Sequence, residues 1–206
     1  MFIILAPTFS ESQFPESDYQ SGNIVDSSNK YNYQDKMVYT VIEDLFDFFV
    51  NNSASKATGY NLWGHSAGGQ FAHRFMMYAD APRAKTVIAA NPGWYTVPDP
   101  AISFPYGWGN LETAIPAITK KAVYEKDFVL MLGTADTTRD SNLRTTAEAD
   151  AQGKNRYERG KFFFSWCQTD AEAHGLKFNW KKVEVEGVAH SQAKMAPAAA
   201  DYLYVN

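Results

Sequence analysis

Hydrophobic and polar residues follow two spacings along the chain, and each spacing predicts its own kind of element. Short continuous apolar runs, or a rough alternation in the last case, predict buried strands. These predicted strands lie at residues 2–6, 59–64, 86–90, 128–132 and 178–185. Apolar residues that recur at helical spacing predict amphipathic helices. The predicted helices lie near residues 35–51, 70–78 and 111–123, from about 155 or 160 to 174, and in the segment that follows 190.

The order of these elements predicts an α/β fold. Strands that alternate with helices indicate βαβ units, which build a mostly parallel sheet with helices on both faces. We therefore expect a three-layer sandwich with a sheet of about five strands. Residues 8–34 are polar and turn-rich, and they predict a long surface loop. The chain has 206 residues without a repeat or linker, so a single domain over residues 1–206 is expected.

The apolar run at residues 2–6 has two interpretations, a first strand or part of a secretion signal. It lacks a basic flank and is too short for the apolar core of a signal peptide, so a strand is favoured. No apolar run in the sequence is long enough to span a bilayer. The sequence as it stands therefore predicts a cytoplasmic protein, unless a signal precedes it.

Charge and cysteine content exclude several classes of function. The net charge is −4 and no long basic run is present, which argues against nucleic acid or an anionic membrane as a partner. Cys167 is the one cysteine, so neither an intramolecular disulfide nor a cysteine-based metal cluster can form. No spacing of His, Asp and Glu suggests a metal site, and no cofactor is expected.

The motif Gly64-His65-Ser66-Ala67-Gly68 lies between a predicted strand and a predicted helix. This context is typical of a nucleophile elbow, where a sharp turn pushes the serine into strained backbone. Glycines on either side let the strand and the helix approach without a side-chain clash. The backbone N–H of Ala67, at the start of the helix, is one candidate oxyanion donor. His65 is a candidate pocket residue, although the motif does not require its side chain.

Two further reactive residues, Asp136 and His190, directly follow predicted strands. The carboxyl ends of parallel strands share one edge of a sheet, so both are expected near Ser66. His190 would accept the Ser66 proton and later protonate the leaving group, while Asp136 would orient the imidazole and stabilise its cation. The order Ser, Asp, His along the chain is that of α/β-hydrolases.

Three other residues compete for these roles. Asp140 is an alternative acid, but Asp136 is favoured because it follows the strand directly. His174 is an alternative base, but its place at a helix end before Gly175 is typical of a solvated or capping histidine. His73, inside the helix after Ser66, is more typical of packing or surface than of chemistry.

Residues 93–110 form a segment rich in Pro, Gly and aromatic residues without periodicity. It has two interpretations: a hydrophobic plug over the sheet edge, or a lid-like insertion that lines a substrate pocket. The pocket is favoured because the segment leaves the strand next to the serine strand, and because large aromatic rings with polar tips suit ligand binding. The candidate substrate-binding residues are Trp94, Tyr95, Tyr106 and Trp108.

Five segments together resemble the α/β-hydrolase superfamily. They are Gly64-His65-Ser66-Ala67-Gly68-Gly69-Gln70-Phe71, Asn91-Pro92-Gly93-Trp94-Tyr95, Phe104-Pro105-Tyr106-Gly107, Leu132-Gly133-Thr134-Ala135-Asp136 and Gly187-Val188-Ala189-His190-Ser191. The chain is most similar to bacterial esterase-like members related to polyhydroxyalkanoate depolymerases and dienelactone hydrolases. The resemblance implies a serine esterase that forms an acyl-enzyme on Ser66 and acts on a small-chain or hydroxyacid ester.

The sequence departs from this family at its beginning. Hydrolases of this fold usually carry three further strands before the one that residues 2–6 match, and a His-Gly-type loop that gives a second oxyanion N–H. Three possibilities remain open: the strands at 2–6 and 59–64 pair directly, the chain is an N-terminally shortened version, or a partner chain such as a second copy covers the sheet. Loss of one oxyanion donor lowers the rate by roughly 10²–10³. A catalytically weak or silent binding module, or a fragment, is therefore the alternative to an active esterase.

Overall fold

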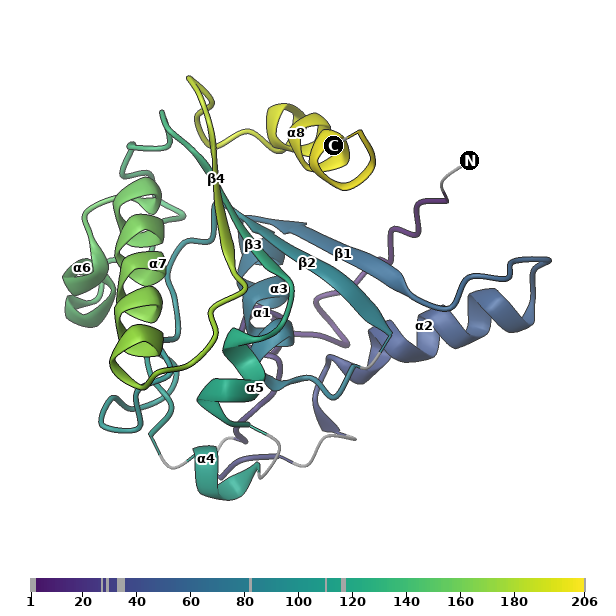
Figure 1. Cartoon of the computed structure of the whole chain (residues 1–206), viewed down its shortest axis with the longest axis horizontal. Coiled ribbons are helices and arrows are strands. Elements are labelled where there is room, and N and C mark those ends of the chain that lie inside the picture. Colours follow the sequence, from purple (N-terminus) through teal and green to yellow (C-terminus); the bar gives the residue numbers. More distant parts are fainter. Residues whose placement is uncertain are drawn as a thin grey trace.

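The computed structural model describes residues 3–26, 28, 30–32, 36–81, 83–109, 111–115 and 118–205. Four strands of these residues form one sheet in the order β1-β2-β3-β4, with every neighbouring pair parallel (Figure 1). The strands are β1 (Tyr60–His65), β2 (Ala84–Ala90), β3 (Phe128–Gly133) and β4 (Lys181–Val185). The predicted α/β class and parallel sheet are confirmed, with four strands in the described residues where about five were expected.

The two central strands are apolar on both faces, as expected of strands buried between two layers of helices. All of β3 is buried, and so are the last four residues of β2. Successive side chains alternate between the layers: Ala89 and Leu130 belong to one apolar cluster, while Ile88 and Val129 belong to the other. A continuous apolar run thus supplies two cores at once.

Helices cover both faces of the sheet (Figure 1). The larger core contains side chains from α2 (Thr40–Asn51), α3 (Ala67–Tyr78), α5 (Lys120–Tyr124) and α7 (Arg156–Ala173). The smaller core lies under α8 (Gln192–Tyr204), which contributes Met195 and Ala199. The other helices are α1 (Glu16–Ser21), α4 (Leu111–Ala114) and α6 (Ala147–Gln152).

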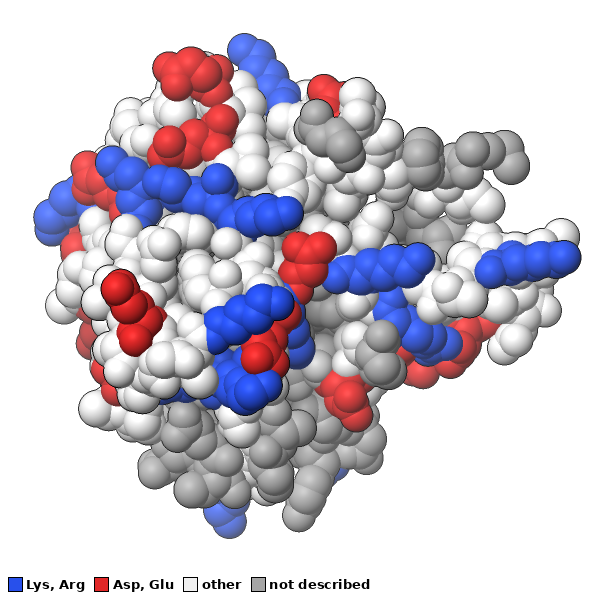
Figure 2. Space-filling view, in the orientation of Figure 1, with Lys and Arg blue, Asp and Glu red and all other residues white. Residues whose placement is uncertain are grey.

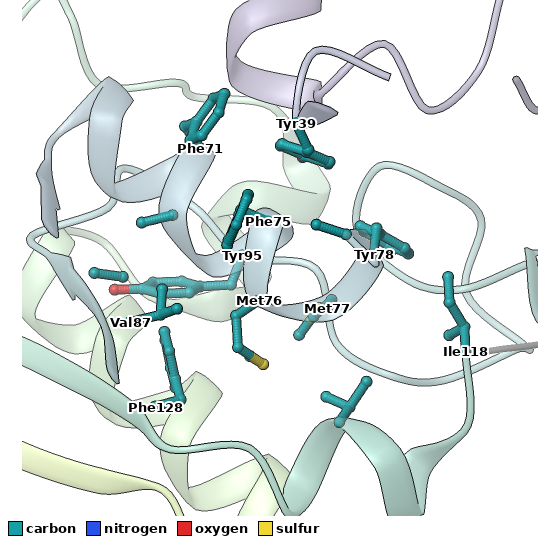
Figure 3. Packing of buried hydrophobic residues seen from close by; sticks show 14 of the residues in the cluster. Tyr39, Phe71, Phe75, Met76, Met77, Tyr78, Val87, Tyr95, Ile118 and Phe128 are labelled. Atoms are coloured by element: carbon teal, nitrogen blue, oxygen red, sulfur yellow. The ribbon is translucent and has the colours of Figure 1, made fainter. Parts of the chain in front are cut away.

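Helix α3 is the most deeply packed of the helices that follow a strand. Every residue from Gly69 to Tyr78 is buried. Phe71 and Phe75 both contact the ring of Tyr39 edge-on, at 5.0 and 5.8 Å between ring centroids (Figure 3). Burial of each large apolar side chain contributes about 1.5–3 kcal/mol. This packing fixes the start of α3, and with it the turn at Ser66.

The prediction of a strand at residues 2–6 is wrong for residues 3–6, the part of this run that the structure describes. Residues 3–6 form no strand, and Ile4 is 89% exposed. A strand needs a hydrogen-bonding neighbour, and this run is not paired with β1. The chain is anchored instead at Phe9, whose ring packs against Phe14, Tyr19 and Phe71. Met1 and Phe2 lie outside the described residues.

The loop predicted over residues 8–34 contains a helix, α1, as well as an antiparallel bridge between Val25 and Tyr31. Helix α1 packs against α3, where the rings of Tyr19 and Phe71 stack at 5.2 Å. Gln70 Nε2 donates a hydrogen bond of 2.7 Å to Gln20 Oε1 in the same contact. This segment therefore forms one wall beside Ser66, and residues 27, 29, 33 and 34 of the predicted loop lie outside the description.

Two predicted helices differ from the observed ones, and one further observed helix was not predicted. The helix predicted at 35–51 begins at Thr40, after a turn at residues 36–39. The one predicted at 111–123 is divided into α4 and α5. Helix α6 was not predicted. Helix α7 begins at Arg156, in agreement with the earlier of the two predicted starts.

None of the described helices combines the length and the apolar character needed to cross a membrane. On the face shown in Figure 2, Lys and Arg side chains are interspersed with Asp and Glu.

Candidate active site

Ser66 lies at the sharp turn between β1, which ends at His65, and α3, which begins at Ala67. Its backbone angles are φ 58° and ψ −116°, a left-handed conformation that is strained for a residue with a side chain. The turn is held by hydrogen bonds on both sides. Ser66 N donates to Ala90 O of β2 at 2.9 Å, and Gln70 N donates to Ser66 O at 3.0 Å. The strained strand–turn–helix geometry predicted for the motif is therefore present.

The glycines around Ser66 have different roles. A Cβ at Gly64 would overlap the backbone carbonyl of Gly68, so the strand and helix approach only because Gly64 has no side chain. A Cβ at Gly69 would lie 2.6 Å from Ala90 O, and the same argument applies. A Cβ at Gly68 would meet only the hydroxyl of Tyr19, at 3.4 Å. The predicted steric role thus holds for Gly64 and not for Gly68.

The loops that carry Asp136 and His190 are joined to each other. Ala135 N donates to Val188 O at 3.0 Å, and Gly187 N donates to Thr134 Oγ1 at 2.8 Å. Because β3 and β4 are parallel neighbours, both loops leave the same edge of the sheet. The acid and the imidazole are thereby held on one rigid unit beside the Ser66 turn.

The structure brings the three predicted catalytic residues together in one chain of hydrogen bonds. His190 Nε2 lies 2.9 Å from Ser66 Oγ, and His190 Nδ1 lies 2.7 Å from Asp136 Oδ2. The Asp136 side chain is 1% exposed and that of His190 is 25% exposed. When Asp136 is ionised, Nδ1–H donates to it, and Nε2 is left to accept the Ser66 proton.

Asp140, the alternative acid, has a different partner. Its carboxylate accepts two hydrogen bonds from Arg156, at 2.7 Å from Nη1 and 3.0 Å from Nη2. These bonds lower the pKa of Asp140 to about 2. The side chain of Arg156 is buried, and its Nη1 also lies 3.8 Å from Asp136 Oδ1. The sequence analysis did not single out Arg156. The helix-start pattern Asn155-x-x-Glu158 contains this residue and could have pointed to it.

The other three histidines make contacts outside this chain of hydrogen bonds. His73 is fully buried; Thr96 N donates to its Nε2 at 3.3 Å, and burial lowers its pKa well below the usual value. His174 lies at the end of α7, where Nδ1 is 2.7 Å from Asp170 O. The ring of His65 packs against that of His190, with 4.6 Å between centroids. Burial, with a smaller effect of the His190 charge, lowers the pKa of His65 to about 4.

A cavity of about 770 Å³ opens in front of Ser66. Ser66, Ala67 and His190 line this cavity together with residues of α1 and of the loop after β3. Ala67 is the first residue of α3, so its backbone N–H has no acceptor within the helix. Ala67, whose N–H is the predicted oxyanion donor, lines the cavity together with Ser66. Within the described part of the chain, no group of three His, Cys, Asp or Glu residues is arranged to hold a metal ion.

The predicted substrate-binding aromatic residues lie in different parts of the structure. Trp94 lines the cavity. Tyr95 and Trp108 are fully buried in the larger core, where Tyr95 stacks on Phe163 at 4.5 Å, and neither lines the cavity. The ring of Tyr106 contacts that of Trp94, with 5.2 Å between centroids, and Tyr106 is not among the residues that line the cavity. In its described part, residues 93–109, the segment therefore acts as a plug at Tyr95 and Trp108 and as a cavity wall at Trp94. His65 is likewise absent from the cavity lining.

Solved structures of known proteins match almost the whole chain, whereas no protein-family model and no curated protein gave a match. Poly(aspartic acid) hydrolase-1 from Sphingomonas sp. KT-1 is 37% identical, with a TM-score of 0.86, over 95% of this chain and 74% of that one. The poly(3-hydroxybutyrate) depolymerase LpqC from Bordetella parapertussis is 28% identical, with a TM-score of 0.88, over 97% and 69%. MPT51 from Mycobacterium tuberculosis, 13% identical over 92% and 73% with a TM-score of 0.53, shares the fold alone. The chain belongs to the α/β-hydrolase superfamily, with a poly(aspartic acid) hydrolase and a poly(3-hydroxybutyrate) depolymerase among its structural relatives.

Proposed function

We propose that this protein is a serine hydrolase that cleaves carboxylic esters through an acyl-enzyme on Ser66. The observation that carries the proposal is the hydrogen-bond chain from Ser66 Oγ through His190 to Asp136, with distances of 2.9 and 2.7 Å. The strained turn at Ser66 and the cavity in front of it support the same conclusion, because a nucleophile must be both exposed to substrate and held by its base. Two of the relatives named above, the poly(aspartic acid) hydrolase and the poly(3-hydroxybutyrate) depolymerase, are hydrolases, which supports the reaction class.

Acylation begins when Ser66 Oγ attacks the carbonyl carbon of the ester. His190 Nε2 takes the hydroxyl proton as the new C–O bond forms, and the π electrons of the carbonyl move onto its oxygen. The N–H of Ala67 donates a hydrogen bond to this oxyanion. When the intermediate collapses, the bond to the alcohol oxygen breaks and His190 gives its proton to that oxygen. Asp136 stabilises the imidazolium cation between the two proton transfers.

Deacylation repeats these steps with water. His190 Nε2 takes a proton from the water as its oxygen attacks the acyl carbon, and then returns the proton to Ser66 Oγ as the acid leaves. The serine and the neutral imidazole are thereby regenerated. A small-chain or hydroxyacid ester is the substrate class we propose, because one relative is a depolymerase of a hydroxyacid polyester.

A second candidate function is ligand binding by a catalytically silent module, and it rests on one specific observation. Ala67 is the one oxyanion donor that we assign, and a hydrolase normally uses two. Such a module would bind its ligand equally well after Ser66→Ala and would show no ester turnover.

Labelling with a fluorophosphonate tests the proposal. The probe reacts only with an activated serine, so we expect stoichiometric labelling of the wild-type protein. Ser66→Ala is expected to abolish labelling, while the control Ser165→Ala, on the exposed side of α7, is expected to retain it. A folded wild-type protein that resists labelling would contradict the proposal.

A further inference from the structure

The walls of the cavity carry charges of opposite sign. Glu16 and Asp18 of α1 line one wall, and Arg144 of the loop after β3 lines another. Arg156 also reaches the cavity, but its guanidinium donates to Asp140 and lies close to Asp136. Its charge is therefore neutralised from within the protein. Arg144 is the other arginine among the residues that line the cavity.

Arg144 is held in place by aromatic rings rather than by anions. Its Cζ lies 4.6 Å from the ring centroid of Trp94 and 5.4 Å from that of Tyr106. The buried guanidinium of Arg74 also contacts the ring of Trp94, at 3.9 Å, so this ring cannot shift freely. A cation over an aromatic face keeps its N–H groups available at its edge, because the rings accept no conventional hydrogen bond from them.

The backbone that carries Arg144 is also fixed. Leu143 is buried, and Leu143 N donates to Asp140 O at 3.1 Å. Asn142 N donates to the carboxylate of Asp140 at 2.9 Å, the same carboxylate that Arg156 binds. The turn over residues 140–143 therefore positions Arg144 before any ligand arrives, which lowers the entropy lost on binding.

The guanidinium of Arg144 has no hydrogen bond and no ion pair with any residue that the structure describes. Three other arginines of this half of the chain are paired: the exposed Arg139 and the buried Arg159 with Asp150, and the buried Arg156 with Asp140. The charge of Arg144 makes only a minor contribution to the lowered pKa of Glu148, whose main causes are hydrogen bonds from its own backbone and from Thr146. In a protein of net charge −4, Arg144 thus lines the same cavity as Ser66 without a carboxylate partner among the described residues.

We propose that Arg144 binds a carboxylate of the substrate, so that the cavity prefers esters whose chain carries a negative charge. The planar guanidinium fork matches a carboxylate with two parallel hydrogen bonds. The acidic wall formed by Glu16 and Asp18 repels the substrate carboxylate. This repulsion directs the anionic end of the substrate towards Arg144. The proposal rests on the proposed function, because it takes Ser66 as the point at which the ester is cleaved.

Three methyl esters of equal chain length test this preference: monomethyl adipate is anionic, methyl hexanoate is neutral and methyl ε-aminocaproate is cationic. We expect kcat/KM to be highest for the anionic ester, with the advantage mostly in KM and reduced by added salt. In Arg144→Gln the ratio of the anionic to the neutral kcat/KM should fall about tenfold, the size expected of one exposed charge-assisted contact. Arg144→Lys should restore part of the ratio.

The matched control is Arg139→Gln, which removes an exposed arginine that pairs with Asp150 away from the cavity. It should leave the ratio unchanged. A preference for the cationic ester, or an anionic preference that Arg144→Gln leaves intact, would overturn the proposal.

A binding measurement separates this inference from the proposed function. Monomethyl adipate is titrated calorimetrically into Ser66→Ala and into the double variant Ser66→Ala, Arg144→Gln, neither of which has the nucleophile. We expect about tenfold weaker binding to the double variant. If the esters are not hydrolysed but binding depends on Arg144, the proposed function fails and the anion site stands. Equal binding to both proteins, or none to either, overturns the anion site.

Discussion

Arg156 Nη1 lies 3.8 Å from Asp136 Oδ1, on the side of the carboxylate opposite to His190. The same guanidinium donates two hydrogen bonds to Asp140, and the backbone N–H of the next residue, Tyr157, donates to Asp136 O at 3.2 Å. The first turn of α7 thus holds the loop that carries Asp136 and Asp140, here called the acid loop, through both backbone and side chain. Because α7 begins here, the positive end of its dipole lies next to the loop that carries Asp136.

Removal of this arginine should destabilise the fold. Arg156→Met leaves the carboxylate of Asp140 and the buried carboxylate of Asp136 without their cation. We expect the free energy of unfolding to fall by about 3 kcal/mol, the low end of the range for a broken buried pair, because Asp140 is 34% exposed. Urea unfolding measures the change.

Arg139→Met is the matched control for that experiment. Arg139 pairs with Asp150 on the surface, and Asp150 keeps Arg159 and Lys154 as further partners. The expected loss is about 0–1 kcal/mol. Equal losses in the two variants would show that Arg156 does not hold the acid loop.

The glycines of the motif should respond differently to alanine. Gly64→Ala places a methyl group against the carbonyl of Gly68, so overpacking should cost about 1–3 kcal/mol and displace Ser66. Gly68→Ala has room and lies in a helix, where alanine is favoured over glycine by up to about 1 kcal/mol. Thermal unfolding of both variants gives the comparison. A larger loss for Gly68→Ala than for Gly64→Ala is incompatible with the packing described above.

Acid should destabilise the protein through His65. Its folded-state pKa of about 4 lies below the value of about 6.5 expected in the unfolded chain, so between these values the unfolded chain binds a proton that the folded one does not. This contribution to stability is complete above about pH 6.5 and is lost as the pH falls towards 4.

His65→Phe removes that titration while keeping a flat ring beside His190. Since His65 Nε2 has no hydrogen-bond partner among the described residues, no hydrogen bond of that atom is lost. We expect urea unfolding at pH 5 and pH 7.5 to show a smaller pH dependence for the variant than for the wild-type protein. His73 titrates in the same direction and remains in both proteins, so only the difference between them is diagnostic. Identical pH dependence in the two proteins would contradict a lowered pKa of His65 in the folded state.

The sheet and the convergence of the triad were predictable because both follow from order along the chain. Short continuous apolar runs such as 128–132 are buried on both faces, and parallel strands deliver the residues after them to one edge. Ser66, Asp136 and His190 therefore meet without any knowledge of the loops.

The errors arose where tertiary contacts decide the structure. The run at 2–6 has strand composition, but a strand also needs a neighbour, and residues 3–6 have none. Helix α1 is short and polar, and it is held by its contact with α3 rather than by periodicity. Helix α6 begins at a Thr146 cap, where Ala149 N donates to Thr146 Oγ1 at 3.3 Å, a local signal that the periodicity argument did not use. The contacts of Arg156 and the proposed role of Arg144 depend on which charges face each other in the folded chain, and the spacing of residues along the sequence does not reveal this.

The central claim, acyl transfer through Ser66, is tested most directly by trapping the acyl-enzyme. The protein is mixed rapidly with p-nitrophenyl acetate, quenched in acid and digested, and the peptides are weighed by mass spectrometry. The account predicts a burst of p-nitrophenolate equal to the enzyme concentration and one acetyl group on Ser66, with both absent in Ser66→Ala. Ester turnover that persists in Ser66→Ala, or an acetyl group found only on other residues, would contradict it.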